Sequence, residues 1–404
     1  MQERIIFHVD VNSAFLSWEA VYRKEVLGEV LDLRTIPSAV GGDTAKRHGI
    51  ILAKSTPAKK YNIQTGEPIH QALLKCPDLL LVPPNHTLYE RYSQSLLNLL
   101  HQYTPDIEPF SIDEAFLDMT GACLNSSPIE TAYGIKDRVK NELGFTVNIG
   151  ISSNKLLAKM ASDFQKPDMV HTLFTNEIPV KMWPLPLEEL YFVGRSTSKI
   201  LHGLGLITIG DIAHTDIRIL KAHLGNKHGQ IIYEYAHGIN NDSVESTESP
   251  NKGYGNSTTL SKDVTDYETA NLVLLSLSET VSARLRAGDV KCSCVTVELT
   301  DCDFTHQTHQ TTLLSPTNTT NTIHETACRL LKEFWDGTPI RLLGIRTTKL
   351  SSEDYTQMNL FDMAKNEKLE KLDKALDSIR NKFGTDAIKR ARFIDSKQEA
   401  RQNE

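Results

Sequence analysis

The chain has 404 residues, 40% of them hydrophobic, with 44 Lys and Arg against 51 Asp and Glu and a formal net charge of −7. This is an ordinary globular composition, long enough for two to four domains. No apolar run reaches the ~20 residues of a membrane span and no signal peptide precedes the first predicted strand, so we expect a cytoplasmic protein without a membrane partner. The net charge does not indicate nucleic-acid binding, although a local basic cleft is compatible with it.

The six cysteines are scattered along the chain without a Cys-x-x-Cys pair. This spacing does not fit a zinc array, and packing is the expected role of these side chains. Free thiols fit a reducing compartment.

The N-terminal pattern is an apolar strand over residues 5–9 that ends in an acid, Asp10. Asn12 or Ser13 is placed to cap a following helix. The expected buried stripe of that helix is Phe15, Trp18 and Val21 or Tyr22.

Residues 110–118 hold two adjacent acids, Asp113 and Glu114, within an otherwise apolar or small-residue stretch. The pattern predicts a buried β-hairpin with the acids at its turn. Buried neighbouring carboxylates repel each other and lose hydration, so a divalent cation such as Mg²⁺ is the natural partner. If Asp10 lies on an adjacent strand, the three acids form a two-metal site for phosphoryl transfer. The simpler alternative is a solvated acidic turn.

Residues 35–68 contain short strands interrupted by Gly41-Gly42-Asp43. A Gly-Gly-Asp motif suggests a nucleotide cyclase, but it is more typical of a hairpin turn. A strand at 49–54 then leads to a turn at Pro57 and a short basic helix. Lys54, Lys59 and Lys60 are placed to contact phosphates there, or have no specific role.

The next elements are an amphipathic helix at 86–104, the acidic hairpin, a helix at 128–143 and a strand at 146–151. Together with the first strand, this is the split βαβ order of a ferredoxin-like sheet. Such a sheet can place Asp10 beside the hairpin acids. A further helix covers 155–162.

Residues 184–236 read as short helices joined by glycine turns that include Gly194 and Gly205. These turns either let backbone N–H groups approach a phosphate or are simply tight α-hairpins. A polar, mobile linker is expected at 238–252.

A second module follows, with strands near 254–262, 291–300, 304–314 and 340–350 and helices at 267–287 and 319–335. This is a separate βαββαβ unit. Its last strand carries Arg341, Arg346 and Lys349, which can follow a DNA backbone from an exposed face. The tail holds a possible docking peptide, with Gln357, Leu360 and Phe361, and a helix at 366–380 with an apolar stripe in a solvated, net positive segment.

Taken together, the motifs resemble the Y-family, or translesion, DNA polymerases, most closely the bacterial DNA polymerase IV branch. The resemblance covers about residues 5–362 and depends on three motifs. These are His8-Val9-Asp10, Ser111-Ile112-Asp113-Glu114-Ala115-Phe116-Leu117-Asp118, and Gly150-Ile151-Ser152-Ser153-Asn154-Lys155 through Lys166-Pro167.

The resemblance implies an α+β right-hand polymerase fold. A ferredoxin-like palm would comprise residues 1–13 and 80–172, and small fingers residues 14–79. A helical thumb with a helix-hairpin-helix would span 173–237, and the linker 238–252. A little finger would cover 253–350, and a tail with a clamp-binding peptide 351–404.

The resemblance also implies functional residues. Asp10, Asp113 and Glu114 would be catalytic and, with the Val11 carbonyl, would hold two Mg²⁺ ions. Phe15 would exclude a ribose 2′-hydroxyl, and Lys166 would hold the triphosphate. Glycine turns at Gly194 and Gly205, with Arg341, Arg346 and Lys349, would bind primer-template DNA. Gln357, Leu360 and Phe361 would bind a bacterial sliding clamp. The expected enzyme is a monomeric, low-fidelity DNA-directed DNA polymerase that uses dNTPs and lacks proofreading.

Two departures from the family pattern concern nucleotide binding. The family's Tyr-x-x-Arg reads Thr56-Pro57-Ala58-Lys59 here, so Thr56 lacks the aromatic surface and Lys59 lacks the bidentate fork. Asn12 and Ser13 stand where many relatives have Asp and a bulkier residue. Small Ser13 and Ala14 would leave room for distorted templates. A nucleotidyl cyclase and a non-catalytic DNA-binding relative remain the alternatives.

Overall fold

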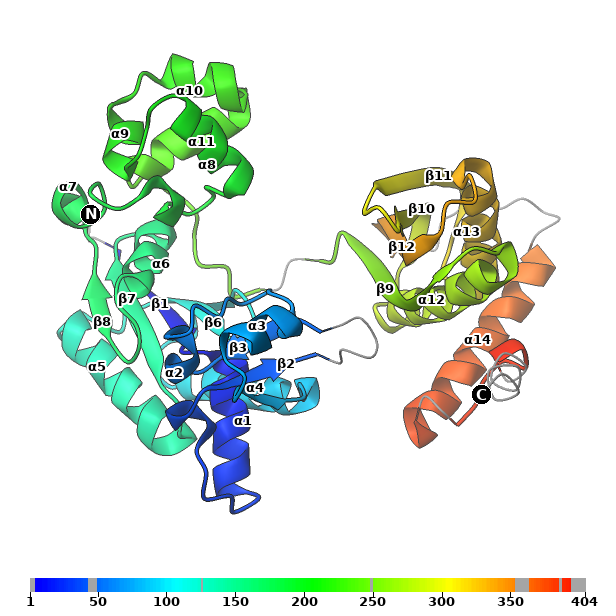
Figure 1. Ribbon diagram of the computed structural model, residues 1–404, viewed down its shortest axis with the longest axis horizontal. Coiled ribbons are helices and arrows are strands. Elements are labelled where there is room, and N and C mark those ends of the chain that lie inside the picture. Colours follow the sequence, from blue (N-terminus) through cyan, green and yellow to red (C-terminus); the bar gives the residue numbers. More distant parts are fainter. Residues whose placement is uncertain are drawn as a thin grey trace. The chain divides into compact units, whose positions relative to one another are not determined.

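The computed structural model describes residues 4–42, 49–124, 126–247, 250–352, 363–384 and 387–393. The described residues divide into two compact units, one up to residue 247 and the other from residue 250 onward. Each unit combines helices with β-sheet (Figure 1), which confirms the α+β class. All six cysteines are free thiols. Within the described residues, no helix is long and apolar enough to cross a membrane.

A five-stranded sheet of order β5-β6-β1-β7-β8 forms the centre of the first unit. Its first four strands follow the ferredoxin-like arrangement that the element order predicts, and β8 adds a parallel strand at the edge. The elements are β1 (Ile6–Val11), α4 (His86–Leu100), β5 (Ile107–Pro109), β6 (Glu114–Asp118), α5 (Pro128–Arg138) with a π-turn at Val139–Leu143, β7 (Val147–Ser152), α6 (Lys155–Asp163) and β8 (Val170–Thr172).

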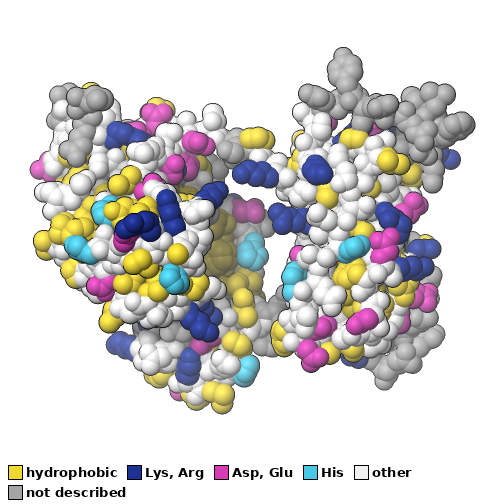
Figure 2. Space-filling model, turned by 90° about the horizontal axis from the view of Figure 1, so that it is seen from above, with side chains coloured by type: hydrophobic (Ala, Val, Ile, Leu, Met, Phe, Trp, Pro, Cys, Tyr) yellow, Lys and Arg dark blue, Asp and Glu magenta, His cyan; other side chains and the backbone are white. Residues whose placement is uncertain are grey.

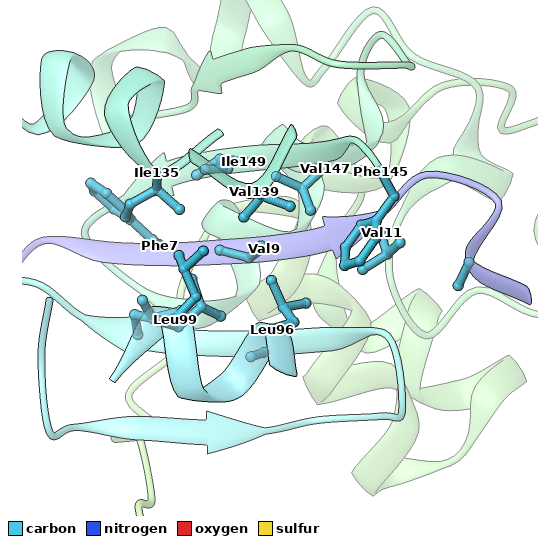
Figure 3. Close-up of a cluster of buried hydrophobic side chains, with 14 of the residues drawn as sticks. Phe7, Val9, Val11, Leu96, Leu99, Ile135, Val139, Phe145, Val147 and Ile149 are labelled. Atoms are coloured by element: carbon cyan, nitrogen blue, oxygen red, sulfur yellow. The ribbon is translucent and has the colours of Figure 1, made fainter. Parts of the chain in front are cut away.

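Strand alternation divides this sheet into an apolar face and a polar face. On β1, the side chains of Phe7, Val9 and Val11 enter one large core with residues of α4, α5 and β7 (Figure 3). The intervening His8 and Asp10 point to the opposite face, and so do the polar residues of β6 and β7. One face of the sheet therefore packs into the hydrophobic core, and the other face carries the polar side chains.

Helix α6 lies very close to the polar face of the sheet because β7 has a glycine at the contact. A Cβ atom on Gly150 would collide with the Ala158 carbonyl and the Ser162 amide of α6. Asn154 caps the helix by accepting a hydrogen bond from the Leu157 N–H at 2.9 Å. This close approach brings the side chains of α6 within reach of the strand acids.

A second, three-stranded sheet of order β3-β2-β4 lies in the same unit. The Ser55 side chain caps α2 by accepting from the Ala58 N–H, and Pro57 lies in the first turn of this helix rather than in a turn before it. Proline suits that position because its missing N–H would be unpaired anyway. The elements are α1 (Ala14–Glu25), the 3₁₀ turn Leu33–Thr35, β2 (Ser38–Gly41), β3 (Ile51–Lys54), α2 (Thr56–Lys59), α3 (Ile69–Lys75) and β4 (Leu80–Val82).

Short helices complete the first unit around a core that also includes apolar residues of α6, among them Leu157 and Met160. Thr208 and Asp211 form a reciprocal capping box at the start of α9. The helices are α7 (Ile178–Lys181), α8 (Arg195–Gly203), α9 (Ile209–His214), α10 (Ile217–Leu224) and α11 (Asn226–Ala236), with 3₁₀ turns at Thr175–Glu177 and Leu187–Glu189.

The expected mobile linker is partly anchored to the first unit. Val244 packs with Ile6 and Phe116, and the Glu245 N–H donates to the Glu108 carboxylate at 2.8 Å. The expected mobility is therefore wrong for residues 244–245, because Val244 finds a packing site that periodicity does not reveal.

The second unit is a four-stranded sheet of order β11-β10-β12-β9 with two helices packed on its core. The βαββαβ order is confirmed, with bounds close to those expected. The elements are β9 (Gly253–Val264), α12 (Tyr267–Ala287), β10 (Lys291–Asp301), β11 (His306–Thr317), α13 (Thr320–Phe334) and β12 (Ile340–Ser351).

Helix α14 (Met363–Phe383) contacts α12 and α13, so the expectation of a solvated tail helix is wrong. Among the residues of α14 whose burial is described, Asp373 is buried at 4% exposure, whereas Leu372 and Ile379 of the predicted apolar stripe are 50% and 38% exposed and Leu369 and Leu376 are partly buried. Asp373 accepts from the Thr320 N–H at 2.8 Å, at the start of α13, and pairs with Arg286 at 3.2 Å. A buried charged residue therefore anchors this helix.

Candidate active site

A cavity of about 530 Å³ opens beside the carboxyl end of β1. It lies between the polar end of the five-stranded sheet, α1, and the β3–α2 junction. Seven residues predicted to act in catalysis or nucleotide binding line it: Asp10, Val11, Phe15, Thr56, Lys59, Asp113 and Lys166. Residues far apart in the chain thus meet in one place, as the sequence predicts.

Asp10 lies on β1, Glu114 begins the neighbouring strand β6, and Asp113 lies in the turn between β5 and β6. Asp10 and Glu114 are opposite each other in the antiparallel β1–β6 register. The Val11 N–H donates to the Asp113 carbonyl at 3.0 Å, which fixes the end of the hairpin turn against β1. Asp113 also accepts a 2.6 Å hydrogen bond from the Ser111 hydroxyl. Asp10 and Asp113 line the cavity, whereas Glu114 is not part of its lining.

Each strand acid has a lysine partner from α6 or the loop after it. Lys166 Nζ lies 3.0 Å from Asp10 and 2.8 Å from Asp163. Lys159 Nζ lies 2.6 Å from Glu114, and sequence reasoning did not identify this lysine. Its position on α6 gives no signal by itself, because the contact depends on how closely Gly150 lets the helix approach.

The two strand acids have pKa values displaced in opposite directions. Burial raises the pKa of Asp10 to about 6, and Lys166 only partly opposes this effect. Burial of Glu114 favours its neutral form, but hydrogen bonds from His8 and Lys159 outweigh that effect and lower its pKa to about 2. Asp10 is therefore the acid whose negative charge is least compensated by the chain itself.

A buried amide pair holds the loop that carries Lys166. Asn12 donates to Asn148 Oδ1 at 3.1 Å and accepts from the Asp168 N–H at 2.9 Å. Asn148 in turn donates to the Gln165 carbonyl at 2.6 Å. These bonds fix the backbone on both sides of Lys166, so Asn12 has a positioning function that its departure from the family pattern did not reveal.

Phe15 forms a firm aromatic wall of the cavity. Its ring stacks on Tyr89 with centroids 4.6 Å apart and an interplanar angle of 13°, and His86 meets it edge-on at 5.9 Å. Rings packed on two sides have little freedom to move aside. This geometry suits a residue that restricts the shape of a bound molecule.

The opposite part of the cavity lining is basic. Lys54 and Lys59 come from the end of β3 and from α2, and Arg34 comes from the 3₁₀ turn before β2. Arg34 is held by Asp32 at 2.7 Å and donates to the Gly144 carbonyl at 2.7 Å. With Lys166, four cations and two acids line the cavity, so an anionic ligand is electrostatically favoured.

The donor set fits a hard divalent cation. The residues are carboxylates and a backbone carbonyl, which are the oxygen ligands of Mg²⁺, and one of them is a buried acid with a raised pKa. Within the described residues, however, no three His, Cys, Asp or Glu side chains already converge on one point. The acids instead contact Lys166, Lys159 and Ser111.

The residues predicted to bind DNA lie in several places. Gly194 is the N-cap of α8, and Gly205 has a left-handed backbone, φ 81°; a Cβ atom at either would meet nothing within 4 Å. On β12, Arg346 is exposed and alternates with buried Ile345 and Thr347. On the face seen in Figure 2, basic side chains are interspersed with acidic and hydrophobic ones.

Arg341 and Lys349 do not simply share the face of Arg346. Arg341 lies over the Phe304 ring at 4.6 Å. Lys349 has a positive φ of 54°, which breaks the strand alternation, and it donates to Thr312 at 3.2 Å. The prediction of one basic strand face is therefore too simple. Gln357, Leu360 and Phe361, the predicted clamp peptide, lie outside the described residues.

The sequence matches the impB/mucB/samB family over residues 9–163 and that family's C-terminal domain over residues 251–360. Residues 188–240 match a domain described as DNA polymerase-iota, thumb domain.

Full-length relatives are also similar. The DNA polymerase IV of Clostridium acetobutylicum is 46% identical over 395 residues, which are 98% of this chain and 99% of the relative. DNA polymerase IV 1 of Bacillus subtilis is 36% identical over 392 residues, 96% of this chain and 93% of the relative.

A solved structure titled Y-family DNA polymerase chimera Dbh-Dpo4(243-245)-Dbh superposes with a TM-score of 0.74 at 23% identity. The match covers 86% of this chain and 100% of the other. At this identity, the superposition establishes a common fold.

Proposed function

The chain belongs to the impB/mucB/samB family of Y-family DNA polymerases, and we propose that it copies damaged templates by two-metal nucleotidyl transfer from a dNTP to a primer 3′-hydroxyl. The observation that carries this proposal is the cavity whose lining combines two acids with four cations. A polyphosphate with bound cations matches that distribution of charge. A cyclase or a non-catalytic DNA-binding protein has no comparable support in the geometry.

In this proposal, Asp10, Asp113, Glu114 and the Val11 carbonyl hold two Mg²⁺ ions. When bound, Mg²⁺ lowers the pKa of the primer hydroxyl and neutralises charge on the phosphates. Lys166 exchanges its contact with Asp10 for the triphosphate, and the Asn12–Asn148 amide pair keeps its loop in place. The chain thus contributes mainly positioning.

Phe15 acts in the same proposal as the gate against ribonucleotides. Its ring lines the cavity and stacks on Tyr89. The 2′-hydroxyl of a ribonucleotide therefore collides with a ring that is held in place. Ser13 and Ala14, which also line the cavity, leave space for distorted base pairs. We propose no proofreading site, because the sequence holds no second acidic cluster suited to an exonuclease.

The remaining proposals concern the parts of the chain. The palm is residues 1–13 and 80–172, the fingers 14–79, the thumb 173–237, the linker 238–252, the little finger 253–350 and the tail 351–404. Gly194, Gly205, Arg341, Arg346 and Lys349 contact primer-template DNA. Gln357, Leu360 and Phe361 bind a sliding clamp, and the enzyme is a monomer of the cytoplasm. A clamp pull-down that Leu360→Ala plus Phe361→Ala leaves unaffected would refute the clamp proposal.

The test is extension of a primed template by the full-length protein with Mg²⁺ and dNTPs, with GTP and ATP cyclisation as controls. The parent should extend the primer, and Asp113→Asn should not, while both bind the primed template equally. Full extension by Asp113→Asn, or cyclisation by the parent, would refute the proposal.

A further inference from the structure

One of the cations that line the cavity, Lys54, has no role in the function proposed above. Lys54, the last residue of β3, lines the cavity and is half-buried. Within the described residues the structure gives neither it nor Lys59 an ion pair. The other two cavity cations have carboxylate partners, since Lys166 pairs with Asp10 and Arg34 pairs with Asp32.

The surroundings of Lys54 make its charge unfavourable in the absence of a ligand. Burial lowers the pKa of the Lys54 ammonium, and the neighbouring charge of Lys59 lowers it further. The nearby acid, Glu67, lies 2.5 Å from Lys75 and is already neutralised by that lysine. A partly buried lysine beside an exposed lysine of like charge gains most from an anion that both can reach.

The local backbone explains how Lys54 is aimed. Along β3, exposure alternates, with Ile51 and Ala53 buried and Leu52 and Lys54 partly exposed. Ser55 then begins α2 by capping it, so Lys54 projects from the strand end directly before the helix that carries Lys59. The two ammonium groups therefore belong to one wall of the cavity.

We propose that Lys54 binds the polyphosphate of the incoming nucleoside triphosphate, supplying from the strand a cation that supplements the single charge of Lys59. This inference rests on the proposed function. At position 59, lysine is a point charge that cannot form the two parallel hydrogen bonds of an arginine. A second ammonium group beside Lys59 adds electrostatic attraction for the phosphates, although it does not reproduce the two parallel hydrogen bonds of an arginine.

The experiment compares Lys54→Met with the parent in single-nucleotide incorporation. Removal of one charge-assisted contact should raise KM for the dNTP about 10- to 100-fold while kcat changes less than about threefold. Lys54→Arg should recover most of the loss. Lys24→Met is the control, because Lys24 is an exposed lysine of α1 outside the cavity lining, and it should leave KM within about twofold.

Two binding measurements identify the partner of Lys54. With a dideoxy-terminated primer, equilibrium affinity for the dNTP should fall in Lys54→Met by the same factor as KM. Inorganic tripolyphosphate, used as a competitor, should also lose affinity, because it carries the phosphates without a base. Affinity for the primed template alone should stay unchanged.

Unchanged KM and dNTP affinity in Lys54→Met would overturn the inference. Loss of template affinity with normal dNTP affinity would also overturn it, by assigning the lysine to a DNA strand. Either result, obtained with an active parent, leaves the proposed function standing. Inactivity of the parent on every primed template would instead refute the proposed function itself.

Discussion

The paired charges of the two units differ in what surrounds them. In the first unit, Asp10 and Lys166 lie 3.0 Å apart with side chains 12% and 30% exposed, and both line a cavity. In the second unit, Arg286 and Asp373 lie 3.2 Å apart with side chains 7% and 5% exposed. Arg286 also reaches Asp377 and the Asn318 carbonyl.

This difference distinguishes charged residues that are available to a ligand from charged residues that stabilise the fold. The Arg286–Asp373 cluster is closed, because further polar groups of α12, α13 and α14 satisfy both partners. The Asp10–Lys166 pair is open on the cavity side, and Asp10 keeps a raised pKa despite its partner. Loss of a member of the open pair should therefore remove function with little loss of stability, and loss of a member of the closed cluster should do the reverse.

The largest expected effect is on the open pair. Asp10→Asn should reduce the rate of primer extension by about 10³-fold or more, because a metal carboxylate contributes several kcal/mol to charge stabilisation in the transition state. The measurement is single-turnover extension with Mg²⁺. Extension at more than about a tenth of the parent rate would show that Asp10 is not essential to the site.

The same variant also has a predicted pH signature. The pKa of Asp10 in the folded protein, about 6, exceeds its ordinary 3.8, so the folded state binds the proton more tightly than the unfolded state. The parent therefore loses stability as the pH rises from about 4 through 6. Asp10→Asn lacks this loss, and its unfolding free energy relative to the parent should increase over that range.

The next largest effect concerns the closed cluster. Asp373→Ala leaves buried Arg286 with one carboxylate fewer and the Thr320 N–H without its acceptor. The free energy of unfolding of the second unit should fall by about 3–5 kcal/mol, as measured by denaturant unfolding. Glu333→Ala, which removes an exposed pair with Arg329 in the same unit, should cost at most about 1 kcal/mol. Equal losses would show that α14 is not held by this cluster.

A smaller loss of stability is expected from a change in the packing of α6 on β7, which also supports the Asp10–Lys166 pair. Gly150→Ala forces α6 away from β7, since the added Cβ would collide with the Ala158 carbonyl. We expect a loss of about 1–3 kcal/mol in the unfolding free energy, together with weaker dNTP binding. Gly134→Ala is the control, because Gly134 is helical with open space around it, and alanine there should stabilise the protein slightly.

The smallest expected effect is on selectivity. Phe15→Ala should reduce discrimination against ribonucleotides by about 10- to 100-fold, equivalent to about 1.4–2.7 kcal/mol, while extension with dNTPs persists. The comparison is the ratio of kcat/KM for dNTP and rNTP in parent and variant. Unchanged discrimination would remove Phe15 from the gate role.

The sequence predicted the parts of this protein that depend on periodicity. Alternation along residues 5–10 and 114–118 places Asp10 and Glu114 on one face, and the register then brings them opposite each other. The order of elements likewise predicted the central sheet of the first unit and the sheet of the second unit. Lys159 and Asn148 were not found, because their contacts depend on the close approach of α6 at Gly150 and on the path of the loop after it.

The docking of α14 was missed for a related physical reason. Its buried side includes Asp373 and Asp377, and charged residues on a helix ordinarily indicate a solvated face. Only the position of Arg286 on α12 reverses that interpretation. A pairing between residues 87 positions apart leaves no local pattern in either helix.

The most direct test of the metal site is Mn²⁺ binding to the full-length protein with a dideoxy-terminated primed template and dNTP, followed by electron paramagnetic resonance. The parent should bind Mn²⁺, whereas the Asp10→Asn plus Asp113→Asn double variant should lose that binding while its DNA affinity and unfolding transition, measured in parallel, stay those of the parent. Equal Mn²⁺ binding by the parent and the double variant would contradict the assignment of these acids as the metal ligands.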